Sequence, residues 1–311
     1  MAHYYTLGAE LPGLKQEQTS LSYSSLELWE GMMRPQFSKR DIRQMELLFL
    51  QEDNKTLIKL LKGLPTEIPT VPVTLGEDTL RTLIRAVEEC RDEENDEPTP
   101  IPENVPAYMV RFVEEYLEGK FEQNGAKGFA EDFLAVAYYD HIRKKAIGFV
   151  KKWVDLNAHI ANIMAATTAK KFGLDISSYL VGASPLTEIL RLSSWTDLQF
   201  LPGSDTLQEI IKVAEESNLY TRERHLDTIR WRFLDEVVFS DTFSIEAMMV
   251  YFLKTRIIER WTTLDKEQGE IAFRTLISSL NSDGKQKLAN FVESTKNKSK
   301  SVADNQQTEK V

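Results

Sequence analysis

The chain has 311 residues, 42% of them hydrophobic, and its 38 Lys and Arg stand against 48 Asp and Glu for a formal net charge of -10. This apolar content excludes wholesale disorder, and the length fits two domains or one large one. The acidic balance argues against binding nucleic acid or anionic lipid through the overall charge, and leaves open only a small local basic patch. The single cysteine, Cys90, excludes an internal disulfide and fits a reducing compartment.

Strand alternation is scarce and helical periodicity is common, so we expect a mostly α fold. In the N-terminal part we expect a short extended piece at residues 3–7 and three helices, at residues 24–33, 39–62 and 77–89. Ser38 is a good N-cap for the second helix, because its hydroxyl can accept an N–H from the first turn.

An acidic stretch marks the best internal boundary. Seven of the ten residues from Glu88 to Glu97 are acidic, and prolines follow up to Pro106. Such a segment buries too little apolar surface to offset chain entropy, so we expect a mobile loop. We therefore divide the chain into an N-terminal helical unit at 1–104, a helical body at 105–293 and a disordered polar tail at 294–311.

The body contains two further long helices. Apolar residues that step by four and three form one face of the first helix, and they are Phe149, Trp153, Leu156, Ile160 and Ile163. Gly173 follows Lys170 and Lys171, which is typical of a helix C-terminus. The second helix is expected over residues 246–263.

The three long helices recur at similar intervals. Their central segments end at Asp53, Asp155 and Arg256, which are 102 and 101 residues apart. Recurrence at a long period favours repeated helical units, whereas poor residue matches equally allow three ordinary amphipathic helices at chance spacing.

No catalytic motif is present: the sequence lacks GxGxxG, GxxxxGK[ST], HExxH and GxSxG patterns. We therefore expect no enzyme activity and no cofactor. Asp155 and His159 share a helix face with Asn162, which indicates a solvated or interface-facing polar stripe more than a metal pair.

The helix at 246–263 has an apolar face that turns ionic at Arg256 and Glu259, followed by Arg260. This pattern indicates either a helix that emerges into solvent or a polar docking surface. Arg256 and Glu259 are spaced to pair with each other.

Several segments resemble a bacterial protein family of unassigned function that is encoded among V/A-type ATPase subunits. The landmarks are Tyr4 to Leu7 with Leu11-Pro12, Phe49 to Asn54, Trp153 to Ile163, Arg224 to Asp227, Phe243 to Lys254, Ile257 to Trp261 and Lys266 to Gly269. The resemblance covers residues 4 to about 292. That family is more distantly similar to the ATPase component named C in archaeal-type enzymes and d in eukaryotic ones. After Lys254 this chain departs from the usual residues of that component, and the proline-rich stretch from Leu64 to Pro106 has no obvious counterpart there.

The resemblance implies three pseudo-repeated helical units of about 100 residues and a non-catalytic role in ion transport. The chain would couple the central axle of a V/A-type ATPase to its membrane rotor ring, on the cytoplasmic face and without direct membrane insertion. We predict Asp155, His159, Asn162, Arg256, Glu259 and Arg260 as interaction residues. The alternatives are an assembly or regulatory adaptor of the ATPase, and an uncharacterised helical enzyme with a ligand or metal.

Overall fold

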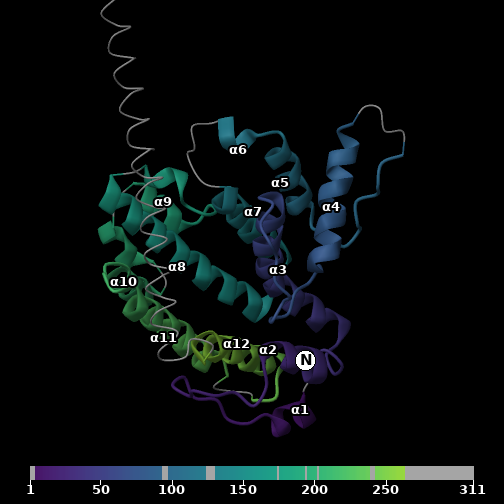
Figure 1. Ribbon diagram of the computed structural model, residues 1–311. Coiled ribbons are helices and arrows are strands. Elements are labelled where there is room, and N and C mark those ends of the chain that lie inside the picture. Colours follow the sequence, from purple (N-terminus) through teal and green to yellow (C-terminus); the bar gives the residue numbers. More distant parts are fainter. Residues whose placement is uncertain are drawn as a thin grey trace, which may run out of the picture. The chain divides into compact units, whose positions relative to one another are not determined.

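The computed structural model describes residues 4–92, 97–123, 130–173, 175–192, 195–201, 203–238 and 242–262. These ranges are helical and contain no β-strand, which confirms the mostly α prediction (Figure 1). The threefold pseudo-repeat and the division at residue 104 stay predictions. The predicted disordered tail, 294–311, lies outside the described residues.

Contacts between Cα atoms divide the chain into residues 1–257 and residues 258–311, with the boundary inside the last described helix. Of the second unit, the structure describes only residues 258–262. In the ranges given above, no helix has the combined length and apolar character that a bilayer crossing requires.

The chain opens with a helix where we expected an extended piece. The N-terminal elements are α1 (Tyr5–Glu10), α2 (Ser25–Glu27), the π-helix η1 (Leu28–Met33), α3 (Lys39–Leu61) and α4 (Gly76–Cys90). The expectation for residues 3–7 is wrong because tertiary contacts hold α1. The Tyr4 N–H donates to the Phe243 carbonyl at 2.8 Å, and Tyr5 packs on the Phe243 ring.

Helix α3 begins directly after its predicted cap, Ser38, and α4 begins at Gly76, one residue before the predicted start. The Ser38 hydroxyl accepts the Asp41 N–H at 3.2 Å and so satisfies one free donor of the first turn of α3. Helix α4 buries Leu80, Leu83 and Val87 and continues to Cys90. Residues 88–90 are therefore helical, contrary to the loop expected there, and residues 93–96 of that acidic stretch lie outside the described part.

The remaining elements form the body. They are α5 (Ala107–Leu117), α6 (Lys120–Gln123), α7 (Ala130–Lys145), α8 (Gly148–Phe172), η2 (Ile176–Ser178), α9 (Pro185–Arg191), η3 (Trp195–Phe200), α10 (Ser204–Ala214), α11 (Leu219–Val238) and α12 (Ile245–Thr262). Helix α8 ends at Gly173 in the left-handed conformation, as predicted. Helix α12 matches the predicted 246–263 to within one residue.

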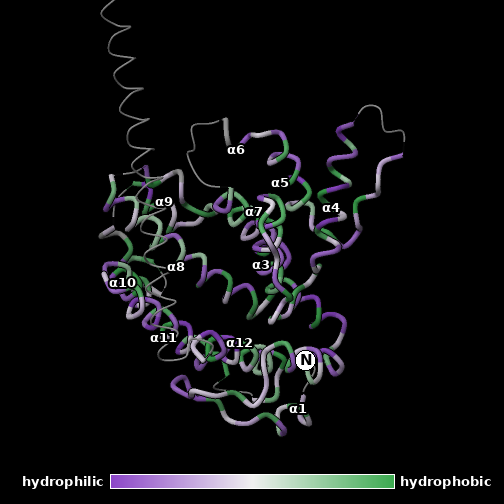
Figure 2. The backbone as a smooth tube through the Cα atoms, in the orientation of Figure 1, coloured by the Kyte–Doolittle hydropathy of each residue, from purple (hydrophilic) through white to green (hydrophobic). Residues whose placement is uncertain are grey.

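Helix α8 is the central element of residues 105–257, because α3, α7, α9, α10 and α11 all contact it. Four residues of its predicted stripe are buried and Trp153 is half-buried. One apolar core joins α8 to α9, α10 and α11 through Leu156, Ile163, Leu190, Ile210 and Ile229. Figure 2 shows hydrophilic and hydrophobic residues alternating along α3 and α4, as expected for helices with one buried face.

A second core joins α3, η1 and α12 through aromatic rings. Trp29 contacts Phe49 with ring centroids 5.0 Å apart, and Phe49 contacts Phe252 at 5.4 Å. Trp29 is 2% exposed, and large rings at this burial contribute strongly to packing energy. This core joins the beginning of the chain to residues about 200 positions later.

Candidate functional site

Polar side chains join α7 to α8 and α8 to α11, and one of them is the predicted residue Asp155. The Arg143 Nε on α7 donates to the Asp155 Oδ1 on α8 at 3.1 Å. The side chains of Arg143 and Asp155 are 18% and 34% exposed, so solvent screens this pair only in part. Helix α7 is thereby joined to α8 by a charge-assisted hydrogen bond beyond their apolar contact.

A second arginine braces α8 from α11. The Arg230 Nε donates to the Asn157 Oδ1 at 2.9 Å, and its Nη1 donates to the Asp227 Oδ1 at 2.8 Å. The Asp227 side chain is 2% exposed and the Arg230 side chain 17%. A carboxylate at this depth is costly unless it is paired, and the guanidinium one helical turn away supplies the pairing.

Tyr139 on α7 lies within the field of both arginines. Burial raises the pKa of Tyr139, while the positive charges of Arg230 and Arg143 act to lower it. The charges of Arg230 and Arg143 therefore both act on Tyr139.

His159 stands one turn beyond Asp155 on α8. Burial lowers the pKa of His159 below its usual 6.5; Asp155 opposes this shift and Arg143 adds to it. A lowered pKa keeps the imidazole neutral at neutral pH. Asp155 and His159 are thus brought together, as predicted, and Arg143 is their shared neighbour.

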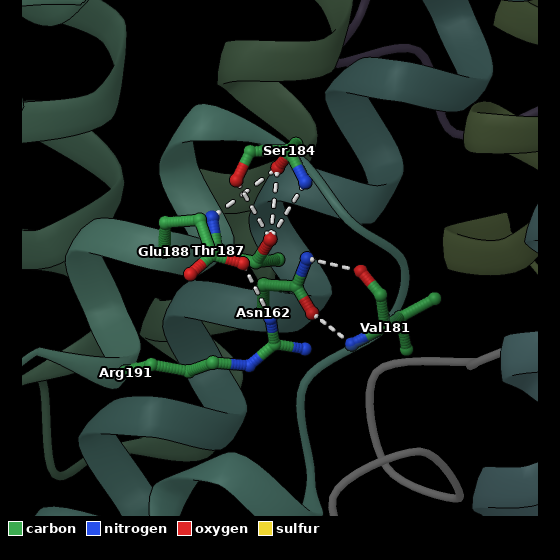
Figure 3. Close-up of polar contacts among 6 residues, drawn as sticks. All are labelled: Asn162, Val181, Ser184, Thr187, Glu188 and Arg191. Atoms are coloured by element: carbon green, nitrogen blue, oxygen red, sulfur yellow. Dashed lines mark hydrogen bonds and ion pairs between the residues drawn. The ribbon is translucent and has the colours of Figure 1, made fainter.

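Asn162 occupies a different environment. It is 0% exposed, its Nδ2 donates to the Val181 carbonyl at 3.0 Å, and its Oδ1 accepts the Val181 N–H at 2.7 Å. Figure 3 shows this amide facing the Val181 backbone. The expected solvated stripe is therefore wrong at Asn162, because the segment before α9 packs over it. Its role as an interaction residue stays a prediction.

The start of α9 beside Asn162 is capped. The Ser184 Oγ accepts the Thr187 N–H at 3.2 Å, and the Thr187 Oγ1 accepts the Ser184 N–H at 2.7 Å, as Figure 3 shows. This reciprocal pair satisfies two donors that a helix start leaves free. Further along α9, the Arg191 Nη1 donates to the Glu188 Oε1 at 2.6 Å. Asn162 and the cap together fix the path of residues 181–187.

Arg256 belongs to a separate polar group. Its Nη2 donates to the Glu52 Oε1 on α3 at 2.9 Å, and Glu52 also accepts from Lys55 at 2.9 Å. The Arg256 and Glu52 side chains are 28% and 22% exposed. This ion pair joins α12 to α3 next to the aromatic core, across 204 positions of the sequence.

The last two predicted residues lie at the end of α12, in the second unit. Glu259 is half-buried and Arg260 is exposed. The Arg260 guanidinium lies 5.0 Å from the centre of the Trp261 ring, a cation–π distance. Their interaction role, like the expected pairing of Arg256 with Glu259, stays a prediction.

Sequence reasoning missed Arg143, Asn157 and Arg230. Asp227 and Arg230 carried a readable signal, because opposite charges three residues apart pair on one helix. Asn157 gave no signal of its own. In the described ranges, no group of three or more His, Cys, Asp or Glu side chains is arranged to hold a metal ion.

In the part of the chain that the structure describes, the regular elements are all helices, and hydrogen-bonded and charged side chains brace the long ones against one another. The chain belongs to DUF2764, a family of proteins of unknown function, whose model matches residues 1–284. No curated protein matches the chain. The family's description names no ATPase, so that link stays a prediction.

Proposed function

We propose that the protein is a non-catalytic subunit of a V/A-type ATPase that couples the central axle to the membrane rotor ring. The proposal rests on the resemblance of the landmark segments to a family encoded with such subunits, and on the bracing described above. A part that transmits torque must deform little under load. Close-packed apolar cores combined with charged links across distant segments supply that stiffness.

The observation that supports the proposal most is the Glu52–Arg256 ion pair, which joins α12 to α3. It lies beside the Trp29, Phe49 and Phe252 rings, so apolar packing and a partly buried charge pair act at the same junction. The two sequence segments around this junction, Phe49 to Asn54 and Phe243 to Lys254, are also landmarks of the resemblance. The junction is therefore where the resemblance and the bracing coincide.

The test replaces Arg256 and asks whether the chain still co-purifies with the ATPase. Arg256→Glu sets a second carboxylate against Glu52, and we expect a folded protein destabilised by about 1–3 kcal/mol that co-purifies less. Arg256→Gln removes the charge without reversing it, and we expect a smaller effect on both measures. Arg232→Glu is the control, because Arg232 forms an ion pair with Glu209 between α11 and α10 and neither residue is a predicted interaction residue.

Circular dichroism and thermal melting separate loss of fold from loss of binding. Co-purification that falls with Arg256→Glu and not with Arg232→Glu, at similar stability, supports the proposal. If all three variants co-purify with the ATPase as well as the unmodified chain does, Arg256 is not an interaction residue. Absence of every ATPase subunit from the unmodified preparation rejects the coupling role.

A further inference from the structure

The turn between α7 and α8 concentrates positive charge in a chain that is acidic overall. Residues 141–154 contain Arg143 and four lysines and no acidic residue, whereas the whole chain has a net charge of -10. The lysines are Lys144 and Lys145 at the end of α7 and Lys151 and Lys152 near the start of α8. All four are exposed. We call these four lysines and Ile147 the basic elbow.

The lysines of the basic elbow have no ion-pair partner among the described residues. Arg143, in the same segment, is committed to Asp155. The negative charges closest to the elbow in sequence are Asp140, one turn before the lysines on α7, and Asp155 itself. The four lysines therefore concentrate positive charge at the elbow, whose field extends about one Debye length, roughly 10 Å, into solvent.

The backbone of the basic elbow is held in place. The Ile147 N–H donates to the Gln44 Oε1 on α3 at 3.0 Å, and the Gln44 Nε2 donates to the Lys145 carbonyl at 3.4 Å. Ala146 is 5% exposed and anchors the turn, whereas the neighbouring Ile147 is 46% exposed. A large apolar side chain is thus fixed outward, with two lysines on each side along the chain.

Helix α3 carries further exposed cations near Gln44, together with the acidic residues Asp41 and Glu46. Lys39, Arg40 and Arg43 lie in its first turns, next to Gln44, and all three are exposed. Burial raises the pKa of Glu46, and the positive charges of Arg34 and Arg43 oppose this shift only in part. Asp41 is engaged by the hydroxyls of Tyr4 and Ser38 at 2.7 Å each. The hydrogen bonds of Gln44 therefore join two groups of cations on neighbouring elements.

We propose that the basic elbow is a docking surface for an acidic segment of a partner protein. Exposed lysines around a fixed apolar anchor match a segment in which carboxylates flank an apolar residue. An extended polyanion, such as a membrane surface or a nucleic acid duplex, would meet a broad face of a chain that carries ten excess negative charges. A discrete acidic segment needs to meet only the elbow. This inference does not depend on the ATPase role.

The test measures binding of two synthetic helical peptides by fluorescence anisotropy. One peptide carries glutamates around a central leucine in an alanine background, and its counterpart carries glutamines in their place. The quadruple variant Lys144→Gln, Lys145→Gln, Lys151→Gln and Lys152→Gln removes the elbow charge. The matched control replaces four other exposed lysines with glutamine, namely Lys15, Lys59, Lys171 and Lys212.

We expect the unmodified protein to bind the glutamate peptide, with an affinity that decreases as salt increases, and not the glutamine peptide. The elbow variant should bind about tenfold more weakly or worse, and the four-lysine control should bind like the unmodified protein. Ile147→Ser should weaken binding at high salt, where the apolar contact contributes a larger share. Each variant is checked by circular dichroism, and because all the lysines are exposed we expect unchanged melting.

Three results would overturn the inference. The first is no binding of the glutamate peptide at low salt, and the second is equal weakening in the elbow variant and the four-lysine control. The third is tighter, elbow-dependent binding to phosphatidylglycerol-containing vesicles or to duplex DNA than to the glutamate peptide, which would replace the acidic protein segment with another occupant. Peptide binding is measured without any ATPase subunit, so failure here and failure of the coupling role are distinguishable.

Discussion

Replacing Asn162 with leucine removes an amide that satisfies both polar groups of one buried peptide segment. The Val181 N–H and carbonyl bond to Asn162 at 2.7 and 3.0 Å, and Val181 is 7% exposed. Leucine has a similar volume and no hydrogen-bonding group, so both backbone groups lose this partner. At about 1–3 kcal/mol for each buried group left without its partner, the expected loss is about 2–6 kcal/mol of unfolding free energy.

For a unit of this size, each kcal/mol shifts the melting temperature by about 2–4 °C, so we expect Asn162→Leu to melt about 4–24 °C lower. The assay is thermal and urea unfolding followed by circular dichroism. Urea midpoints with unchanged slopes would show that the two chains unfold from comparable native states.

Asn157→Leu is the matched control in the same helix. Asn157 also makes two hydrogen bonds, donating to the Trp153 carbonyl at 2.8 Å and accepting from Arg230 at 2.9 Å. It is half-buried, so water can replace part of what is lost, and we expect a cost of about 1 kcal/mol. Equal losses for the two variants, or a loss below about 1 kcal/mol for Asn162→Leu, would refute the argument from burial.

Three further changes test other contacts. Gly8→Ala places a Cβ 2.8 Å from the Phe243 ring, so we expect α1 to shift and the melting temperature to fall. Chemical denaturation should show a loss of about 1–3 kcal/mol of unfolding free energy. An unchanged stability would show that the ring moves freely. Arg230→Ala takes the guanidinium from the buried Asp227 carboxylate, and we expect a loss of about 2–5 kcal/mol in urea unfolding, against little change if water replaces it. Burial lowers the pKa of His159, so the unfolded chain binds that proton more tightly, and stability should fall as pH drops through 6.5 and below. His159→Gln should flatten this part of the stability curve, and an identical slope in the variant would contradict the shift.

Local signals predicted the long helices well. Ser38 and Gly173 act through neighbouring backbone groups, so the start of α3 and the end of α8 follow from residues within one turn. Four-and-three stepping correctly predicted the buried face of α8, because a helix in contact with a core must turn one side toward it. Fold class was therefore accessible from the sequence.

Pairings between distant segments were not accessible. Asn162 reads as a polar residue on an exposed stripe until Val181, nineteen residues later, lies over it. Nothing local indicates that Arg256 pairs with Glu52, or that Tyr4 bonds to Phe243 and so makes α1 helical. The basic elbow, by contrast, was readable as fourteen residues without an acid. Its exposure and its attachment to α3 required the structure.

In the proposed role, this protein is a permanent mechanical part of an ATPase. Quantitative mass spectrometry of the complex, purified from native membranes of the source organism, tests it most directly. We expect this chain at a fixed ratio to the catalytic subunits in every preparation, including those washed at high salt. A chain that is absent, or present in small and variable amounts that decline with washing, would contradict the coupling role and favour a transient assembly or regulatory adaptor.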